Sequence, residues 1–111
     1  MPAEYNMELY RLKAELCKTF SDPTRLIIIN ELRSGEKVVG RLVEILRIPQ
    51  PVVSRHLAIL RERGVVSSRR EGTSNYYSLT EPKIGEACDI VHNILLNQIA
   101  KNKELAERLM P

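Results

Sequence analysis

The sequence has few of the residues that enzymatic and secreted folds depend on. Its 111 residues include two cysteines and two histidines. Cys17 and Cys88 lie far apart without paired spacing, which excludes a disulfide-rich secreted scaffold. The chain also lacks a glycine-rich phosphate loop, a metal-binding tetrad and a nucleophile–base arrangement. We therefore expect a protein that is not an enzyme and needs no cofactor.

Long apolar runs are missing as well. No stretch approaches the length of a membrane span, and the first eight residues lack the basic and apolar regions of a secretion signal. We expect a soluble cytoplasmic protein with no membrane partner, in which isolated thiols serve as small core residues. A chain of this length predicts a single domain over residues 1–111 with one compact core.

Net charge is low but unevenly distributed. The chain carries +3 overall, whereas residues 47–70 contain six arginines and one glutamate. Basic charge concentrated in this way indicates a polyanionic partner better than total charge does. A solvated basic face is the alternative interpretation.

The segment from Pro49 to Arg63 has one apolar side and one basic, hydrogen-bonding side. At about 100° per residue, its apolar residues share one face of a helix: Val53, Leu57 and Leu60. Arg55 lies on the opposite side. Pro51 suits a first helical turn, and Gly64 suits the left-handed position after a helix end. The pattern predicts a helix over residues 50–63 with one buried side and one side facing an anion.

Helical patterns upstream predict three more helices, over residues 7–19, 23–32 and 38–46. The second begins at Pro23 after a capping residue in Ser21–Asp22. A turn of about three residues, 47–49, joins the third helix to the helix 50–63. Two short helices joined by a tight turn, the second with an exposed polar face, have the form of a helix-turn-helix.

After Gly64 the sequence favours strands. Residues 65–70 and 75–79 are rich in β-branched, aromatic and small polar residues, and they flank a glycine-containing turn. This hairpin, 65–79, is expected to be a wing. A last helix is predicted from Pro82 to about residue 108, with Thr80 or Glu81 as its cap. The fold class is α+β, mainly α: a winged helix-turn-helix with five helices and a two-stranded wing.

The first and last predicted helices carry more apolar surface than one core requires. Ile90, Leu96 and Ile99 widen the apolar band of the last helix beyond a single stripe. We therefore expect the helices 7–19 and 82–108 to be buried against a second subunit.

These residues resemble the ArsR family of small winged-helix transcriptional regulators. Residues 20–26, FSDPTRL, resemble the family's opening signature, and residues 50–57, QPVVSRHL, resemble its recognition helix. The similarity runs from about Leu16 to Leu79. The resemblance implies a homodimer, paired largely through its first and last helices, that binds a palindromic operator in double-stranded DNA and usually represses transcription.

The resemblance does not extend to the family's cysteine motif. Metal-sensing members carry two cysteines flanking one residue, followed by an aspartate, at the start of the third helix. The matching positions here are Val38, Gly40 and Arg41. A thiolate site cannot form from these residues, so the resemblance does not imply arsenic or cadmium sensing.

Side chains near the start of the helix 50–63 are the expected readers of DNA, since such a helix fits the major groove. Gln50, Ser54 and Arg55 are predicted to contact base edges, with a phosphate as the alternative ligand of Arg55. His56 borders the buried face, and two roles are open for it: a DNA contact or a hydrogen-bonded structural histidine.

The predicted wing adds candidate contacts to the DNA backbone. Arg69 and Arg70 alternate in direction along a strand, so we expect one of them to face DNA. Thr73 and Ser74 supply short donors at the tip. Arg41 and Arg47 are either further backbone contacts or ordinary surface charges.

Two sensing hypotheses involve the last helix. Cys88, Asp89 and His92 lie within one helical turn, and thiolate and imidazole suit zinc or copper. Family members with a site on this helix place Asp and His two residues apart, whereas the spacing here is three. We expect Cys88 to be a core or interface residue and His92 a polar group at the dimer seam. Redox sensing by Cys17 and Cys88 is the other hypothesis.

The predicted function is that of a sequence-specific DNA-binding regulator. A non-specific DNA-coating protein is the alternative, which would show a steep dependence on salt and little sequence preference. The operator and any effector are not readable from the sequence.

Overall fold

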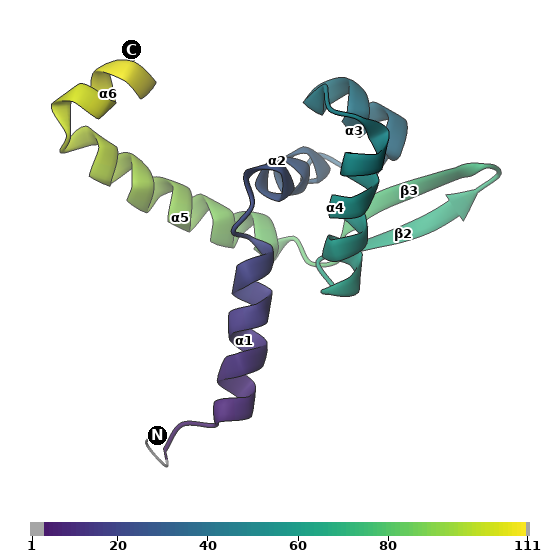
Figure 1. The fold of residues 1–111 in the computed structure, drawn as a ribbon, viewed down its shortest axis with the longest axis horizontal. Helices are drawn as coiled ribbons and strands as arrows, with labels where there is room; N and C mark the ends of the chain where they lie inside the picture. The colour runs from purple at the N-terminus through teal and green to yellow at the C-terminus, as the bar shows by residue number, and fades with distance from the viewer. Residues whose placement is uncertain (1–3, 111) are drawn as a thin grey trace. The chain divides into compact units, whose positions relative to one another are not determined.

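A computed structural model describes residues 4–110 of the chain. Residues 1–3 and residue 111 lie outside the described part. Residues 1–3 begin the segment that is predicted to lack a secretion signal. The chain divides into two compact units, one up to Glu81 and one from Pro82. The first contains α1 (Met7–Thr19), α2 (Pro23–Leu32), β1 (Lys37–Val38), α3 (Val39–Leu46), α4 (Gln50–Glu62), β2 (Val66–Glu71) and β3 (Ser74–Leu79), and the second contains α5 (Lys83–Ala100) and α6 (Lys103–Leu109) (Figure 1).

The core of the first unit is formed where α4 packs against α2, α3 and the start of β2. Its fully buried apolar side chains are those that helical and strand periodicity turn inward: Ile28, Ile29, Leu42, Val53, Leu57, Leu60, Val65 and Val66. Close packing of these side chains fixes α4 against the rest of the unit, and a helix held on one side presents its other side to solvent.

α2 begins as the sequence predicts. Asp22 is its N-cap, and its carboxylate accepts a hydrogen bond from the backbone N–H of Arg25 at 3.2 Å. Pro23 occupies the first turn, where a backbone N–H has no acceptor within the helix, so its absence in proline costs no hydrogen bond. The start of α2 is therefore set by local chemistry.

The turn between α3 and α4 contains no glycine, and Arg47 takes the conformation that glycine usually supplies. Its φ is +56°, in the left-handed region, and its N–H donates to the carbonyl oxygen of Val43 at 2.8 Å. Pro49 then caps α4 without a side-chain hydrogen bond. The two helices and this turn form the predicted helix-turn-helix.

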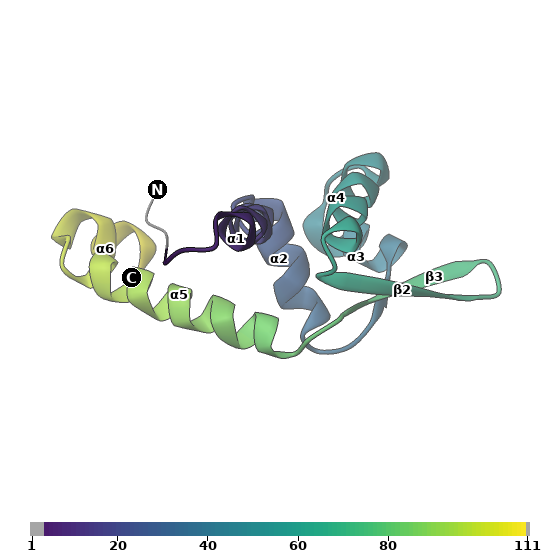
Figure 2. The same ribbon diagram turned by 90° about the horizontal axis from the view of Figure 1, so that it is seen from below.

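The wing is a three-stranded antiparallel sheet in the order β1-β3-β2. β2 and β3 pair from Val66 with Leu79 to Glu71 with Ser74, and Gly72, at φ +62°, opens the two-residue turn. The tip of this hairpin extends beyond α3 and α4 (Figure 2). The expected two strands are thus joined by a third, because β1 pairs with Tyr76 and Tyr77 of β3.

The second unit corrects the prediction of one helix over residues 82–108. α5 ends at Ala100, and Asn102 caps α6 by accepting a hydrogen bond from the N–H of Leu105. The described part of the chain therefore has six helices in place of the expected five. Neither Thr80 nor Glu81 caps α5: the N-cap is Pro82, and the Thr80 hydroxyl donates to the carbonyl oxygen of Gly64 at 2.7 Å. Over residues 4–110, the helices are too short or too polar to cross a membrane.

Candidate DNA-binding surface

α4 has a buried face and a solvent face, as its sequence pattern predicts. Val53, His56, Leu57 and Leu60 are buried, whereas Gln50, Ser54 and Arg55 are exposed. Gln50 is the first residue of the helix, and Ser54 follows one turn later on nearly the same side. The three predicted base contacts therefore all lie on the solvent side of α4.

A groove runs between α4 and the wing. It is lined by Ser54, Ala58, Arg61 and Glu62 of α4 and by Tyr77 of β3. Ser54, Ala58 and Arg61 are spaced at i, i+4 and i+7, so they form one row along the helix. Within residues 4–110, the guanidinium groups of Arg55 and Arg61 have no hydrogen-bond or ion-pair partner. Both cations are available to a ligand in solvent.

Sequence reasoning did not single out Arg61 or Tyr77 for this surface. The spacing of seven residues from Ser54 is the signal that identifies Arg61, because it returns to the same face of a helix. Tyr77 is recognised only once the pairing of β2 with β3 is known. The candidate DNA-binding surface therefore includes residues beyond the three predicted at the start of α4.

His56 lies on the buried side of α4, beneath this surface. Its side chain is 10% exposed, and its Nδ1 lies 3.4 Å from Nη1 of Arg25 and 4.0 Å from Oδ1 of Asp22. A guanidinium only donates hydrogen bonds, so Nδ1 is the acceptor in the contact with Arg25. Of the two roles considered for His56, its position favours the structural one over a DNA contact.

The cluster around His56 connects the start of α2 to the middle of α4. Arg25 also donates from Nε to the carbonyl oxygen of Thr19 at 2.8 Å, which adds the end of α1. The backbone N–H of Arg25 lowers the pKa of Asp22 below its usual value, and partial burial opposes this effect. The Asp22 carboxylate thus remains charged, caps the start of α2 and lies close to His56.

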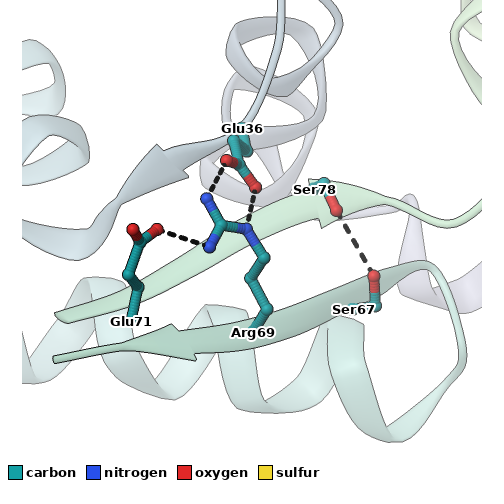
Figure 3. Close-up of polar contacts among 5 residues, drawn as sticks. All are labelled: Glu36, Ser67, Arg69, Glu71 and Ser78. Carbon is teal, nitrogen blue, oxygen red and sulfur yellow. Dashed lines mark hydrogen bonds and ion pairs between the residues drawn. The ribbon is translucent and has the colours of Figure 1, made fainter.

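On the wing, the two arginines have different surroundings. Arg69 donates from Nε and Nη2 to the carboxylate of Glu36, at 2.9 and 2.5 Å, and from Nη1 to Glu71 at 2.7 Å (Figure 3). Arg70 is exposed and donates from Nε to the carbonyl oxygen of Gly72 at 3.1 Å. Arg69 is therefore paired within the protein, whereas the Nη groups of Arg70 face solvent.

These contacts shift the titration of both partners. The hydrogen bonds from Arg69 lower the pKa of Glu36 below its usual value, and the carboxylates of Glu36 and Glu71 raise the pKa of Arg69. Glu36 and Arg69 therefore stay ionised throughout the ordinary pH range.

The remaining candidates occupy the edges of the surface. Thr73 lies exposed in the two-residue turn at the wing tip, and Ser74 begins β3 half-buried. Arg41, on α3, pairs with Glu44 at 3.0 Å, and Arg47 is exposed in the turn before α4.

The alternative metal site on α5 does not assemble. Within residues 4–110, no three His, Cys, Asp or Glu side chains come together as a metal-binding group, and this includes Cys88, Asp89 and His92. Cys17 is exposed on α1 and Cys88 is half-buried on α5.

Comparison with known proteins identifies the family. The family model described as "Bacterial regulatory protein, arsR family" matches residues 22–68, which include α2, α3 and α4. An HTH-type transcriptional regulator of Methanocaldococcus jannaschii is 39% identical over 89 residues, covering 79% of this chain and 100% of the relative. The chain belongs to the ArsR family of transcriptional regulators.

Solved structures agree with this ArsR-family assignment. The crystal structure of the transcriptional repressor BigR from Xylella fastidiosa has a TM-score of 0.71 and 36% identity, over 85% of this chain and 96% of that one. A homodimeric winged helix-turn-helix DNA-binding domain from Mycobacterium bovis has a TM-score of 0.75 at 24% identity, over 86% of this chain and 88% of that one. The chain therefore has the winged helix-turn-helix fold.

The sequence departs from the metal-sensing members of the family at three positions, which the structure locates. The positions that carry the thiolate motif in metal-sensing members lie in β1 and at the start of α3, and they hold Val38, Gly40 and Arg41. None of these side chains is a soft metal ligand. This ArsR-family chain has the helix-turn-helix and the wing without that motif.

Proposed function

We propose that this chain is a sequence-specific, DNA-binding transcriptional repressor of the cytoplasm, without catalytic activity. The observation that carries the proposal is the solvent face of α4. It presents an amide, a hydroxyl and two unpaired guanidinium groups beside a projecting wing. Such a helix fits the major groove, where amides and guanidinium groups distinguish base edges. Relatives named as repressors, such as the biofilm growth-associated repressor of Xylella fastidiosa, support the direction of regulation.

Each contact has a chemical role in this proposal. Gln50 recognises adenine through its side-chain amide, and Ser54 donates to a base edge or phosphate next to it. Arg55 binds guanine or a phosphate. Arg61, in the same row of α4 as Ser54, binds a phosphate, as do Arg70 and Thr73 at the wing.

The working form in this proposal is a homodimer on a palindromic operator. α1 exposes Leu9, Leu12 and Leu16, and α5 exposes Ile90, Val91, Ile94 and Leu95, with Leu12 61% and Val91 65% exposed. Apolar surface of this extent on two helices favours a second subunit. The homodimeric Mycobacterium bovis neighbour supports the same assembly. A two-fold dimer would bind half-sites about one DNA turn apart.

The direct test is selection of bound sequences from a random pool of double-stranded DNA. We expect a symmetric site, bound at least about 10³-fold more tightly than random DNA. Gln50→Ala or Ser54→Ala is expected to weaken operator binding by about 1–3 kcal/mol and to relax base preference. Arg108→Ala, which removes a cation from α6, is the matched control and should leave binding unchanged.

The same titrations separate the alternatives. If no sequence is enriched and binding falls steeply with salt, the protein coats DNA non-specifically and the proposal is wrong. Sedimentation of the Leu12→Glu and Val91→Glu variants tests the dimer. Monomers are expected, since each change places a charge on the apolar surface, and intact dimers would contradict this interface.

A further inference from the structure

The strongest polar cluster on the wing is centred on Arg69. The Arg69 guanidinium makes two hydrogen bonds to Glu36 and one to Glu71, and its central carbon lies 4.6 Å from the centre of the Tyr76 ring. Three of its five N–H donors are used within the protein, and one face of its plane is covered by the aromatic ring. Two carboxylates surround one guanidinium, so the cluster as a whole is anionic.

This cluster lies on the face of the wing that points away from α4. Neighbouring residues of a strand point to opposite faces, so Tyr76 and Tyr77 lie on opposite sides of β3. Tyr77 lines the groove beside α4, whereas Tyr76 stacks with Arg69. Arg69 therefore shares the outer face with the Ser67–Ser78 pair (Figure 3). Arg70, the next residue along β2, therefore lies on the opposite face of the wing, the face toward α4.

The partner of Arg69 belongs to a different part of the unit. Glu36 immediately precedes β1, which pairs with β3 and leads directly into α3. The next residue, Lys37, donates from Nζ to the carbonyl oxygen of Glu31 at 2.6 Å and to the hydroxyl oxygen of Ser34 at 2.9 Å. Hydrogen bonds thus run from the end of α2 through this segment to Arg69 in the outer half of β2.

We propose that Arg69 is a positioning residue: its ion pairs with Glu36 and Glu71 set the angle of the wing, and it makes no contact with DNA. This inference rests on the proposed DNA-binding function. A phosphate would have to displace two carboxylates to reach Arg69, and it would approach an anionic cluster. Arg70, on the opposite face, supplies the phosphate contact.

Glu36→Gln gives the sharpest test, because a phosphate-contact role and a positioning role of Arg69 predict opposite changes in DNA affinity. If Arg69 contacts phosphate, removal of the Glu36 charge frees a cation and tightens DNA binding. If Arg69 positions the wing, the same change loosens the wing and weakens operator binding, by about two- to fivefold for an exposed ion pair. Glu44→Gln is the matched control: it removes an exposed carboxylate that pairs with Arg41, and is expected to tighten binding or leave it unchanged.

Salt titrations of Arg69→Ala and Arg70→Ala provide a second readout. Loss of a phosphate contact lowers the slope of log K against log salt by about one unit. We expect this decrease for Arg70→Ala and an unchanged slope for Arg69→Ala. The double variant Glu36→Gln/Arg69→Ala should bind no more weakly than Arg69→Ala alone, since both changes break one interaction. A lower slope for Arg69→Ala, or tighter binding by Glu36→Gln, overturns the inference.

Amide hydrogen exchange tests the positioning role without DNA. Glu36→Gln is expected to speed exchange in β2 and β3 while the amides of α4 remain as protected as in the unmodified protein, which also shows that the variant folds. Unchanged exchange in the wing contradicts the inference even if the protein binds its operator. Faster exchange in a protein that shows no sequence preference for DNA contradicts the proposed function instead.

Discussion

α4 and the wing each contact an arginine, and the two arginines have contrasting surroundings. Arg25 lies beneath α4, half-buried against His56 and the Asp22 carboxylate, on top of an apolar core. Arg69 lies on an exposed hairpin and relies on Glu36 and Glu71. The apolar core fixes α4 whether or not the polar cluster forms, whereas the wing tip has no buried side chain beyond Val66 in β2. The helix should therefore be rigid and the wing adjustable.

The largest expected effect tests the apolar support of the helix. Leu57 is fully buried in α4, so Leu57→Ala leaves a cavity in the core between α2, α3 and α4. We expect a loss of about 2–5 kcal/mol in the free energy of unfolding, measured with denaturant. A loss below about 1 kcal/mol would show that α4 does not depend on this core.

His56→Ala tests the buried polar cluster and is expected to have the second largest effect. It leaves Arg25 without its acceptor on α4, at a cost of about 1–3 kcal/mol in unfolding free energy. Asn30→Ala, at an exposed position of α2, is the control and should change stability by less than about 0.5 kcal/mol. Equal effects of the two substitutions would show that the buried polar cluster does not stabilise the protein.

Acid should loosen both clusters. The pKa of Asp22 and that of Glu36 are lower in the folded protein than their usual values of 3.8 and 4.5. The contribution of each carboxylate to folding stability is complete above its usual pKa and is lost as the pH falls through its lower pKa in the folded protein. Amide exchange measured from pH 5 downward should therefore show faster opening than the intrinsic pH dependence of exchange predicts. In Glu36→Gln, the wing should lose this acid-dependent part while α2 keeps it, and an unchanged acid response of the wing would argue against the Glu36 contact.

The smallest effect is expected on the outer face of the wing. The hydroxyl groups of Ser67 and Ser78 lie 3.3 Å apart and are exposed, so water replaces this hydrogen bond readily. Ser67→Ala is expected to change unfolding free energy by less than about 0.5 kcal/mol and to leave DNA affinity unchanged. A larger loss would mean that the wing is held by more than the Arg69 cluster.

The elements that carry local signals were predictable from the sequence. α1 and α2 begin and end where the apolar spacing and the Asp22–Pro23 cap predict, and the solvent face of α4 follows from its periodicity. The break before α6 also had a local signal, since Asn102 is a capping residue three positions before Leu105. The charged sequence around it was instead interpreted as a continuation of one helix.

The features that were not predictable depend on contacts between distant residues. β1 has two residues and exists only because Lys37 and Val38 find partners in β3. Glu36 and Arg69 are 33 positions apart, and no periodicity connects them. For the same reason the sequence left both roles of His56 open: its angle on α4 places it at the border of the buried face, and only the packing of Arg25 against it decides the side.

The strand order also has a consequence for how the protein behaves at high concentration. β2 is an edge strand, so one side of its backbone is open to pairing with a strand of another molecule. Its outer end carries three consecutive charged residues, Arg69, Arg70 and Glu71. An incoming strand would have to desolvate these charges, which opposes edge-to-edge aggregation. The chain can therefore extend a long hairpin into solvent and still resist forming intermolecular sheets.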